Sequence, residues 1–349
     1  MKRIVMCAAL LAAVTSVQVA AQEFLLKLPR PSPRARVTQT IGITDITVDY
    51  SRPGVKGRRI WGSLVPYDRV WRSGADENSF ITFSTPATIG GHEIPAGSYG
   101  IHMIPGRVYW TIILSTQHRA WGSFTYDESE DAVRVQVRPH DVPHRERLMY
   151  YFEDIASNSV RVSMEWEQRA VSFEVTVDVN ATVVEELRNT LRGTAGRWWA
   201  GWFKAAEWCM EHNTNLDESL GWIERSITSD RNFINVRTKA LILEKQGYTE
   251  EAQAVMREAV SIATESQVLQ YAELLMADGE TDRAISVLKE NLRKNPESWR
   301  AHTALADAYL QKNEKQEALE LYEAALKVTS DEKVAAIIHA IMDEIEKNH

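Results

Sequence analysis

The chain has 349 residues, of which 44% are hydrophobic, and its formal net charge is −8. This length accommodates two domains with cores of their own. The negative charge lies almost wholly in residues 181–349, which hold 20 Lys plus Arg against 29 Asp plus Glu, whereas residues 22–180 hold 18 against 19. Because an acidic surface repels nucleic-acid phosphates and anionic lipid headgroups, the composition argues against both as partners.

The first 21 residues have the pattern of an export signal. Lys2 and Arg3 precede an apolar stretch over 4–14, and a small-residue cleavage motif follows at 19–21. The apolar stretch is too short to cross a bilayer, and no later segment is apolar for about 18 residues running, so no membrane span is expected. The sequence therefore predicts a mature chain that begins at Gln22 and is periplasmic or secreted.

After removal of that signal, one cysteine remains. Cys209 follows Trp208 in an apolar helical pattern, so we expect a buried, unreactive thiol and neither an internal disulfide nor a cysteine-rich metal cluster. Residues 22–35, with three prolines, are expected to form an extended leader.

Residues 36–180 have the pattern of antiparallel strands. Apolar and polar residues alternate along several segments, which gives each strand one buried and one exposed face. The clearest strands are expected at 46–50, 133–137, 160–166 and 171–179, with shorter ones at 80–85, 100–105, 108–115 and 148–155.

Short connections are expected between these strands. Gly90-Gly91 is typical of a two-residue hairpin, because glycine accepts the positive φ angles of such turns. Residues 167–169 are expected to reverse the chain between two strong strands. Eight or more short strands with frequent turns predict a β-sandwich, with a closed barrel as the alternative.

From residue 181 onward the apolar period changes from 2 to 3.6, which indicates helices. Thr182 is placed to cap the first helix, and Gly193 and Gly196 are expected to end it. The remainder repeats every 32 to 34 positions, the period of tetratricopeptide helix pairs. Pairs are expected at 198–229, 231–264, 266–295 and 298–328, followed by a capping helix over 331–347.

Two further features belong to this helical half. An aromatic-rich segment at its start is too apolar for a free surface helix, so we expect it to pack on the sandwich or to cap the solenoid; it holds Trp198, Trp199, Trp202, Phe203 and Trp208. The predicted turns within pairs hold Gly247, Gly279 and Asn313, which tolerate left-handed backbone. The predicted fold is thus α+β, an antiparallel β-sandwich over 36–180 followed by a tetratricopeptide-like solenoid over 181–349.

A dense polar cluster precedes the strand expected at residue 80. Its members are Trp71, Arg72, Ser73, Gly74, Asp76, Glu77 and Asn78. On a loop held by rigid strands, Arg72 would pair with an anionic or polyhydroxyl group and Trp71 would stack on it. The competing interpretation is structural, with Arg72 in an internal ion pair and Trp71 in the core. Asp76 and Glu77 are a weak glycosidase signal, because adjacent side chains on an extended chain point to opposite faces.

Two other motifs carry candidate chemistry. Trp121 and Tyr126 form a sugar-stacking platform if they are exposed, and fill space between the sheets if they are not. Ser98 lies in a sequence close to a nucleophile elbow, but a strand is expected after it where an elbow needs a helix, so we interpret it as a turn serine.

Histidines raise the question of a metal site. His140, Asp141, His144 and Glu146, joined by His92 or His102, are metal-ligand types, but we expect a proline-containing loop there without ligands one helical turn apart. The sequence also contains no phosphate-cradling glycine loop and no dinucleotide fingerprint. We therefore assign no metal, no cofactor and no catalytic residue.

Several short motifs of the β region occur in combination. They are Lys56–Gly62, Leu64–Tyr67, Val70–Glu77, Pro95–Tyr99, Trp121-Gly122 with Tyr126, and Met164–Glu167. Together they resemble the bacterial domain-of-unknown-function 2911 family over about residues 30–180, and the helical repeats resemble tetratricopeptide arrays. The resemblance implies an exported β domain, and it brings no established activity.

These observations favour an exported, non-catalytic binding or scaffold protein. The solenoid would dock a protein or peptide partner, and the sandwich loops would bind a small ligand or glycan. The alternative is a hydrolase that acts on envelope or polysaccharide substrates through the loop from Arg72 to Asn78. A purely structural envelope protein is the third class.

Overall fold

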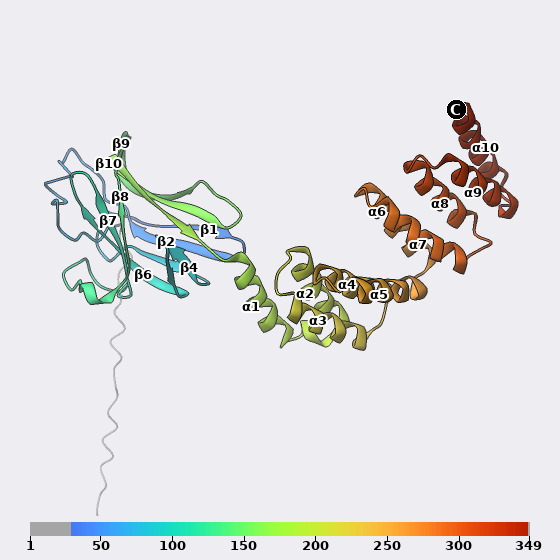
Figure 1. The fold of residues 1–349 in the computed structure, drawn as a ribbon. Coiled ribbons are helices and arrows are strands. Elements are labelled where there is room, and N and C mark those ends of the chain that lie inside the picture. The colour runs from blue at the N-terminus through green and yellow to red at the C-terminus, as the bar shows by residue number, and fades with distance from the viewer. Residues whose placement is uncertain (1–28, 348–349) are drawn as a thin grey trace, which may run out of the picture.

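The computed structural model describes residues 29–347, which form two β-sheets followed by ten α-helices (Figure 1). The predicted export signal and residues 22–28 of the predicted leader lie outside this range. The remaining leader residues lie against the sheets, because Arg52 N donates to Pro33 O at 2.9 Å and Arg147 Nη1 donates to Pro31 O at 3.3 Å. Within this range no helix is both long enough and apolar enough to cross a membrane.

The β region is a sandwich of two antiparallel sheets, as predicted, and not a closed barrel. One sheet has six strands in the order β1-β2-β3-β6-β7-β8, and the other has four in the order β5-β4-β10-β9. The strands are β1 (Arg34–Ile41), β2 (Thr44–Ser51), β3 (Phe80–Phe83), β4 (Ala87–Ile89), β5 (His92–Ile94), β6 (Gly97–Pro105), β7 (Trp110–Ser115), β8 (Asp131–Val137), β9 (His140–Glu153) and β10 (Ser159–Thr176).

The core lies between the sheets and centres on four tryptophans. The ring of Trp61 lies 4.7 Å from that of Trp110 and 5.9 Å from that of Trp166. Trp71 stacks on Trp166 with centroids 5.8 Å apart and an interplanar angle of 17°. Such aromatic pairs add about 0.5–1.5 kcal/mol each beyond their burial. The cluster therefore fixes the start of the loop that follows Trp71.

The hairpin predicted at Gly90-Gly91 is confirmed. Ile89 pairs with His92 across it, and both glycines have positive φ, +57° and +81°. An L-residue with a side chain would adopt this backbone only with strain.

The turn predicted at residues 167–169 is wrong, because β10 runs through it without reversing. Glu167 has a φ of +56° and lies in a β-bulge where the register with β9 shifts. The buried positions are even-numbered before the bulge, as at Trp166, and odd-numbered after it, as at Val171. At each of the two register shifts, four residue steps of β9 face two of β10, so the additional residues lie on β9. The change of buried face along β10 resembled a turn in the sequence.

The segment from His140 to Glu146 is also not a loop. It forms the exposed first half of β9, in which Arg145 pairs with Glu165 at 3.0 Å and His144 lies 3.6 Å from Glu146. Pro143 is tolerated there because β9 is the edge strand of its sheet.

Helix α1 (Val179–Leu191) joins the sandwich to the solenoid (Figure 1). Its cap is Asp178, whose side chain accepts from Ala181 N at 2.9 Å, and not Thr182, which lies inside the first turn. Thr182 was the wrong choice because the helix begins four residues earlier than a cap at that position would place it.

Four helix pairs and a final helix follow. They are α2 (Trp199–Glu211) with α3 (Leu216–Ser229), α4 (Phe233–Lys245) with α5 (Thr249–Ile262), α6 (Glu265–Ala277) with α7 (Thr281–Lys294), α8 (Trp299–Gln311) with α9 (Lys315–Val328), and α10 (Glu332–Lys347). This confirms the predicted repeats. Gly247, Gly279 and Asn313 have φ of +87°, +79° and +62° at the turns inside three pairs, as expected.

The aromatic segment caps the solenoid and does not pack on the sandwich. Phe203 and Cys209 are buried in a cluster with residues of α1, α3 and α4, and Trp199 and Trp202 pack against it. Burial raises the pKa of the Cys209 thiol to about 11, which keeps it protonated. Trp198 remains exposed.

Candidate functional site

The loop between Trp71 and β3 is built largely by contacts to its own backbone. The Ser73 carbonyl accepts hydrogen bonds from Ser79 Oγ at 3.0 Å and from the buried Tyr150 hydroxyl at 3.1 Å. Gly74 is required there, because a Cβ would lie 2.5 Å from Ser79 Oγ. Trp71 packs against the core, so its ring belongs to the sandwich interior. Trp71, Ser73 and Gly74 therefore position the loop.

The charged members of the loop do not converge. Arg72 Nη1 donates to the backbone oxygen of Asp76 at 2.7 Å, while Glu77 forms an ion pair with Arg30 and lies 3.7 Å from Arg34. The hydrogen bond from Arg30 is the main reason why the pKa of Glu77 is lowered. Asp76 has a φ of +61°, a left-handed conformation. No histidine joins this group in the part of the chain that the structure describes.

A second loop, residues 116–127, lies over the outer face of the six-stranded sheet beside Arg72. Asn78 N donates to Ala120 O at 3.2 Å, and a Cβ on Gly122 would lie 2.9 Å from Arg72 Cζ. Gly122 has a φ of +78°, a backbone conformation that disfavours a side chain. The close approach of Arg72 also leaves no room for one. The polar loop and this second loop, about 50 residues apart in sequence, thus form one surface.

Aromatic rings are exposed on that surface. Trp121 is 58% exposed and Phe124 is 82% exposed, and Arg72 Cζ lies 5.6 Å from the centroid of the Phe124 ring. We call Arg72, Trp121, Gly122, Ser123 and Phe124 together the Arg72–Phe124 surface. Sequence reasoning singled out Trp121 but missed Phe124, although the spacing of two aromatics around a glycine is visible in the sequence.

Beneath the second loop lies a buried polar row. The register of β3 with β6, β6 with β7 and β7 with β8 sets Asn78, His102, Ile113 and Arg134 side by side on the outer face of the sheet. Asn78 is 2% exposed, and its amide oxygen and nitrogen have no hydrogen-bond partner within residues 29–347.

His102 is the titratable member of this row. It is 2% exposed, and its Nδ1 lies 2.9 Å from Ser123 Oγ. Burial lowers the pKa of its imidazole to about 4, so the ring is neutral at pH 7.

Tyr126 belongs to the same layer and is not a free stacking plate. Its ring lies 5.1 Å from that of His102, and its hydroxyl donates to Asp131 Oδ2 at 2.7 Å while accepting from Arg134 Nη1 at 3.0 Å. Burial, followed by the bond to Asp131, raises the pKa of the Tyr126 hydroxyl. The other carboxylate oxygen of Asp131 is buried and has no partner in the described chain.

The remaining sequence candidates lie apart from this surface. Ser98 lies in β6 with its Oγ 2.8 Å from Thr82 Oγ1, and the strand continues after it. Across residues 29–347 no three His, Cys, Asp or Glu side chains are grouped so that they would hold a metal ion.

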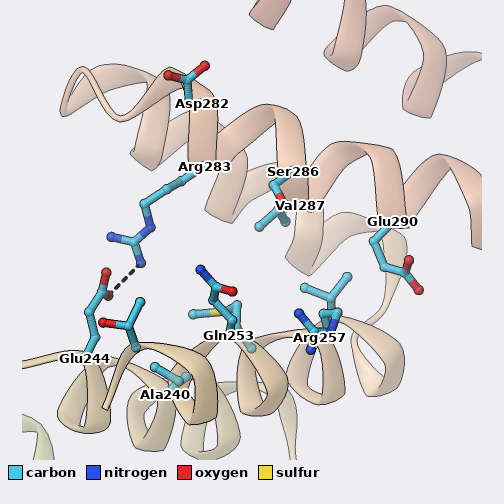
Figure 2. Close-up of a pocket in the computed structure, with 13 residues that line it drawn as sticks. Ala240, Glu244, Gln253, Arg257, Asp282, Arg283, Ser286, Val287 and Glu290 are labelled. Atoms are coloured by element: carbon cyan, nitrogen blue, oxygen red, sulfur yellow. Dashed lines mark ion pairs between the residues drawn. The ribbon is translucent and has the colours of Figure 1, made fainter. Parts of the chain in front are cut away.

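The solenoid carries a cleft between α5 and α7, the second helices of two successive pairs, with the end of α4 at one side (Figure 2). It encloses about 400 Å³. Its apolar lining comes from Ala240, Ala252, Met256, Val260 and Val287. Figure 2 shows Gln253 extending from one wall toward the wall that holds Ser286 and Val287, with Arg257 farther along the first wall.

Charged side chains surround this cleft. Arg283 of α7 pairs with Glu244 of α4 at 3.1 Å and so ties the two walls together. Glu290 has a lowered pKa, chiefly because Arg293 hydrogen-bonds it, and the positive charges of Arg293 and then of Arg257 lower it further. Arg257 itself has neither a hydrogen bond nor an ion pair with any described residue, so its guanidinium is available to a ligand.

Comparison with known families agrees with the motifs. Residues 32–175 match the family described as "Protein of unknown function (DUF2911)", and residues 238–265 and 269–333 match two tetratricopeptide repeat families. The resemblance stated from the sequence is thereby confirmed. No curated protein matches the chain.

Solved tetratricopeptide structures are similar to the helical part. The MamA fragment from residue 41 of Desulfovibrio magneticus RS-1 is 15% identical, with 43% of this chain and 96% of that chain covered and a TM-score of 0.23. A tetratricopeptide repeat protein from Parabacteroides merdae is 19% identical, with 43% and 60% covered and a TM-score of 0.27. YrrB, described as having an unusual peptide-binding site, is 18% identical, with 46% and 85% covered and a TM-score of 0.25.

Proposed function

We propose that this chain is an exported scaffold whose solenoid docks a segment of a protein partner in the cleft between α5 and α7. The tetratricopeptide repeats support a protein-interaction role, and proteins built from such repeats bind partners along their stacked helices. The export signal expected in the sequence supports a site of action in the periplasm or outside the cell. The main observation in support of the proposal is the cleft, in which the apolar residues Met256 and Val260 lie beside Arg257, a cation without a partner in the described chain.

The lining defines the segment that would fit. Met256 and Val260 present an apolar floor on which one or two apolar side chains would be buried, at about 25 cal/mol per Å² of apolar area. Arg257, which lacks a partner in the described chain, would pair with a carboxylate of the bound segment. We therefore propose a peptide with an apolar anchor beside an acidic residue or a chain end.

Peptide display against the full mature chain tests this proposal. Selected peptides should bind the Met256→Asp variant at least about tenfold more weakly, because a carboxylate on the apolar floor opposes burial of the anchor. Leu274→Asp is the matched control, since Leu274 is an exposed apolar residue of α6 outside the cleft. Peptides that bind Met256→Asp as tightly as the unmodified chain would refute the proposed cleft.

A second site is proposed on the sandwich, where the Arg72–Phe124 surface would bind a small molecule or glycan. The exposure of two aromatic rings next to a half-buried arginine favours it, because aromatic faces stack on the apolar faces of sugar rings. Trp121→Ala should abolish binding of any oligosaccharide that the mature chain takes up. Unchanged binding by that variant would remove this surface from the proposal.

A further inference from the structure

Arg72 is a half-buried arginine of the sandwich that has no carboxylate partner among residues 29–347. Seven others pair with acids in the described chain, namely Arg30, Arg34, Arg36, Arg134, Arg145, Arg161 and Arg169. Arg72 is half-buried, and its one hydrogen bond goes to the backbone oxygen of Asp76. A partly desolvated guanidinium without a counter-charge attracts an anion, and a carboxylate fits its planar fork of donors.

Backbone donors lie beside this guanidinium. Gly122 holds its positive φ against Arg72, and neither its N–H nor that of Ser123 donates a hydrogen bond to any residue from 29 to 347. Free N–H groups in a turn with left-handed residues are typical of anion-binding concavities. The cation and the two donors therefore favour the same kind of ligand group, a carboxylate.

Buried polar atoms beneath the second loop suit the neutral hydroxyl groups of a ligand. The Asn78 amide offers an acceptor and a donor, and Asp131 Oδ1 offers an acceptor, and none of these atoms has a partner in the described chain. Asn78 is 2% exposed, and its backbone N–H is bonded to Ala120 O of the second loop. Burial of polar atoms without partners is unfavourable, and a ligand with hydroxyl groups would supply those partners.

From this juxtaposition we propose that the Arg72–Phe124 surface recognises an acidic sugar, a pyranose ring that bears a carboxylate. The inference rests on the proposed glycan-binding function of this surface and names the ligand class. The carboxylate pairs with Arg72 and the Gly122 and Ser123 N–H groups. The ring stacks on Trp121, and its hydroxyls bond to Asn78. An aromatic acid would leave the amide unpaired, and a neutral sugar would leave Arg72 unpaired.

Ligand entry requires the second loop to shift, since Asn78 lies beneath it. Two of the contacts that hold the loop lie at this point, namely Asn78 N to Ala120 O at 3.2 Å and His102 Nδ1 to Ser123 Oγ at 2.9 Å. The end of the loop is held separately by the Tyr126 hydroxyl, which bonds to Asp131. A bound ring that spans Arg72 and Asn78 would tie the two loops together. Hydrogen exchange in residues 116–127 should therefore slow when the ligand binds.

The experiment compares one oligosaccharide in two charge states. Calorimetry with the full mature chain should show binding of trigalacturonate, and its methyl ester should bind at least about tenfold more weakly because the ester removes the charge that Arg72 recognises. Arg72→Gln should weaken binding of the acid to the level of the ester. Arg138→Gln is the matched control, because Arg138 also lies over an exposed ring, that of Tyr109 at 5.8 Å.

The outcomes separate this inference from the function on which it rests. Equal binding of the acid, the ester and neutral maltotriose, all lost in Trp121→Ala, would overturn carboxylate recognition and leave glycan binding standing. Failure of trigalacturonate, a hyaluronan tetrasaccharide and maltotriose alike to bind would overturn both. Trp121 is exposed, so Trp121→Ala leaves the fold intact and remains informative even if Arg72→Gln unfolds the loop.

Discussion

His102 makes the stability of the sandwich depend on pH between about 4 and 6.5. Its imidazole has a pKa of about 4 in the fold because of burial, against 6.5 in an open chain. Between these values the unfolded chain binds a proton that the folded chain excludes, so stability rises with pH across this window and is lost as pH falls. At 1.36 kcal/mol per unit, the difference amounts to about 3 kcal/mol.

Two measurements check this value. The imidazole resonances of His102, assigned by their loss in His102→Asn, should not titrate above pH 5 in the native chain. Hydrogen exchange of β6 and β7 should report a local opening free energy that falls by about 2 kcal/mol between pH 7 and pH 5 in the unmodified chain and stays nearly flat in His102→Asn. Asparagine keeps a polar partner for Ser123, which lies 2.9 Å from the imidazole.

The pH range over which His102 affects stability can be told apart from the range over which the carboxylates do. Glu77, Glu146 and Glu218 have pKa values below their ordinary value of 4.5, because of bonds from Arg30, Lys56 N and Arg188 respectively. Their contribution to stability is present above pH 4.5 and is lost at lower pH. The reasoning about burial is refuted if every histidine of the native chain titrates near pH 6.5, or if both proteins show the same slope from pH 7 to pH 5.

Three further outcomes test the backbone and the core. Gly90→Ala should destabilise the sandwich by about 2 kcal/mol in thermal unfolding, because φ is +57° and the new methyl would lie 2.4 Å from a valine of β8. Gly91→Ala meets open space and should cost less. Asp178→Ala should lower the free energy of unfolding by about 1 kcal/mol and Thr182→Ala by less, because only the Asp178 side chain accepts from a free helix N–H. The reverse order of melting temperatures would contradict the assigned cap. Cys209 should resist a disulfide reagent at pH 8 until denaturant is added, since it is fully buried and its pKa is raised to about 11; rapid labelling of the native chain would disprove this.

Much of the fold was predictable because it is encoded over short distances. The alternation along Ile46, Val48 and Tyr50 and the repeat near 34 residues each reflect the geometry of one strand or one helix pair. The sharpest errors came from single-residue effects. A bulge at Glu167 and a turn there leave the same phase change in the apolar pattern, and only the continued pairing with β9 distinguishes them.

The candidate site was predicted less completely, because it depends on contacts between distant segments. The loop residues were identified, but the partner of Arg72 was not, and it turned out to be the Asp76 backbone and the ring of Phe124. His102 was considered only as a metal ligand, although it is buried beside Ser123. No local pattern marks such a pair, since 21 residues separate them.

The sequence by itself determined the element types, the two-sheet and helix-pair architecture and the acidic character of the solenoid, because periodicity, turn residues and charge are properties of neighbouring residues. Tertiary structure alone decided which side chains lost water and which found partners. Strand register sets Asn78 beside His102, the stacking of α5 and α7 opens the cleft at Met256, and burial sets the pKa of the imidazole. These are consequences of long-range packing, in which the same residue types are either solvated or isolated according to what the fold places over them.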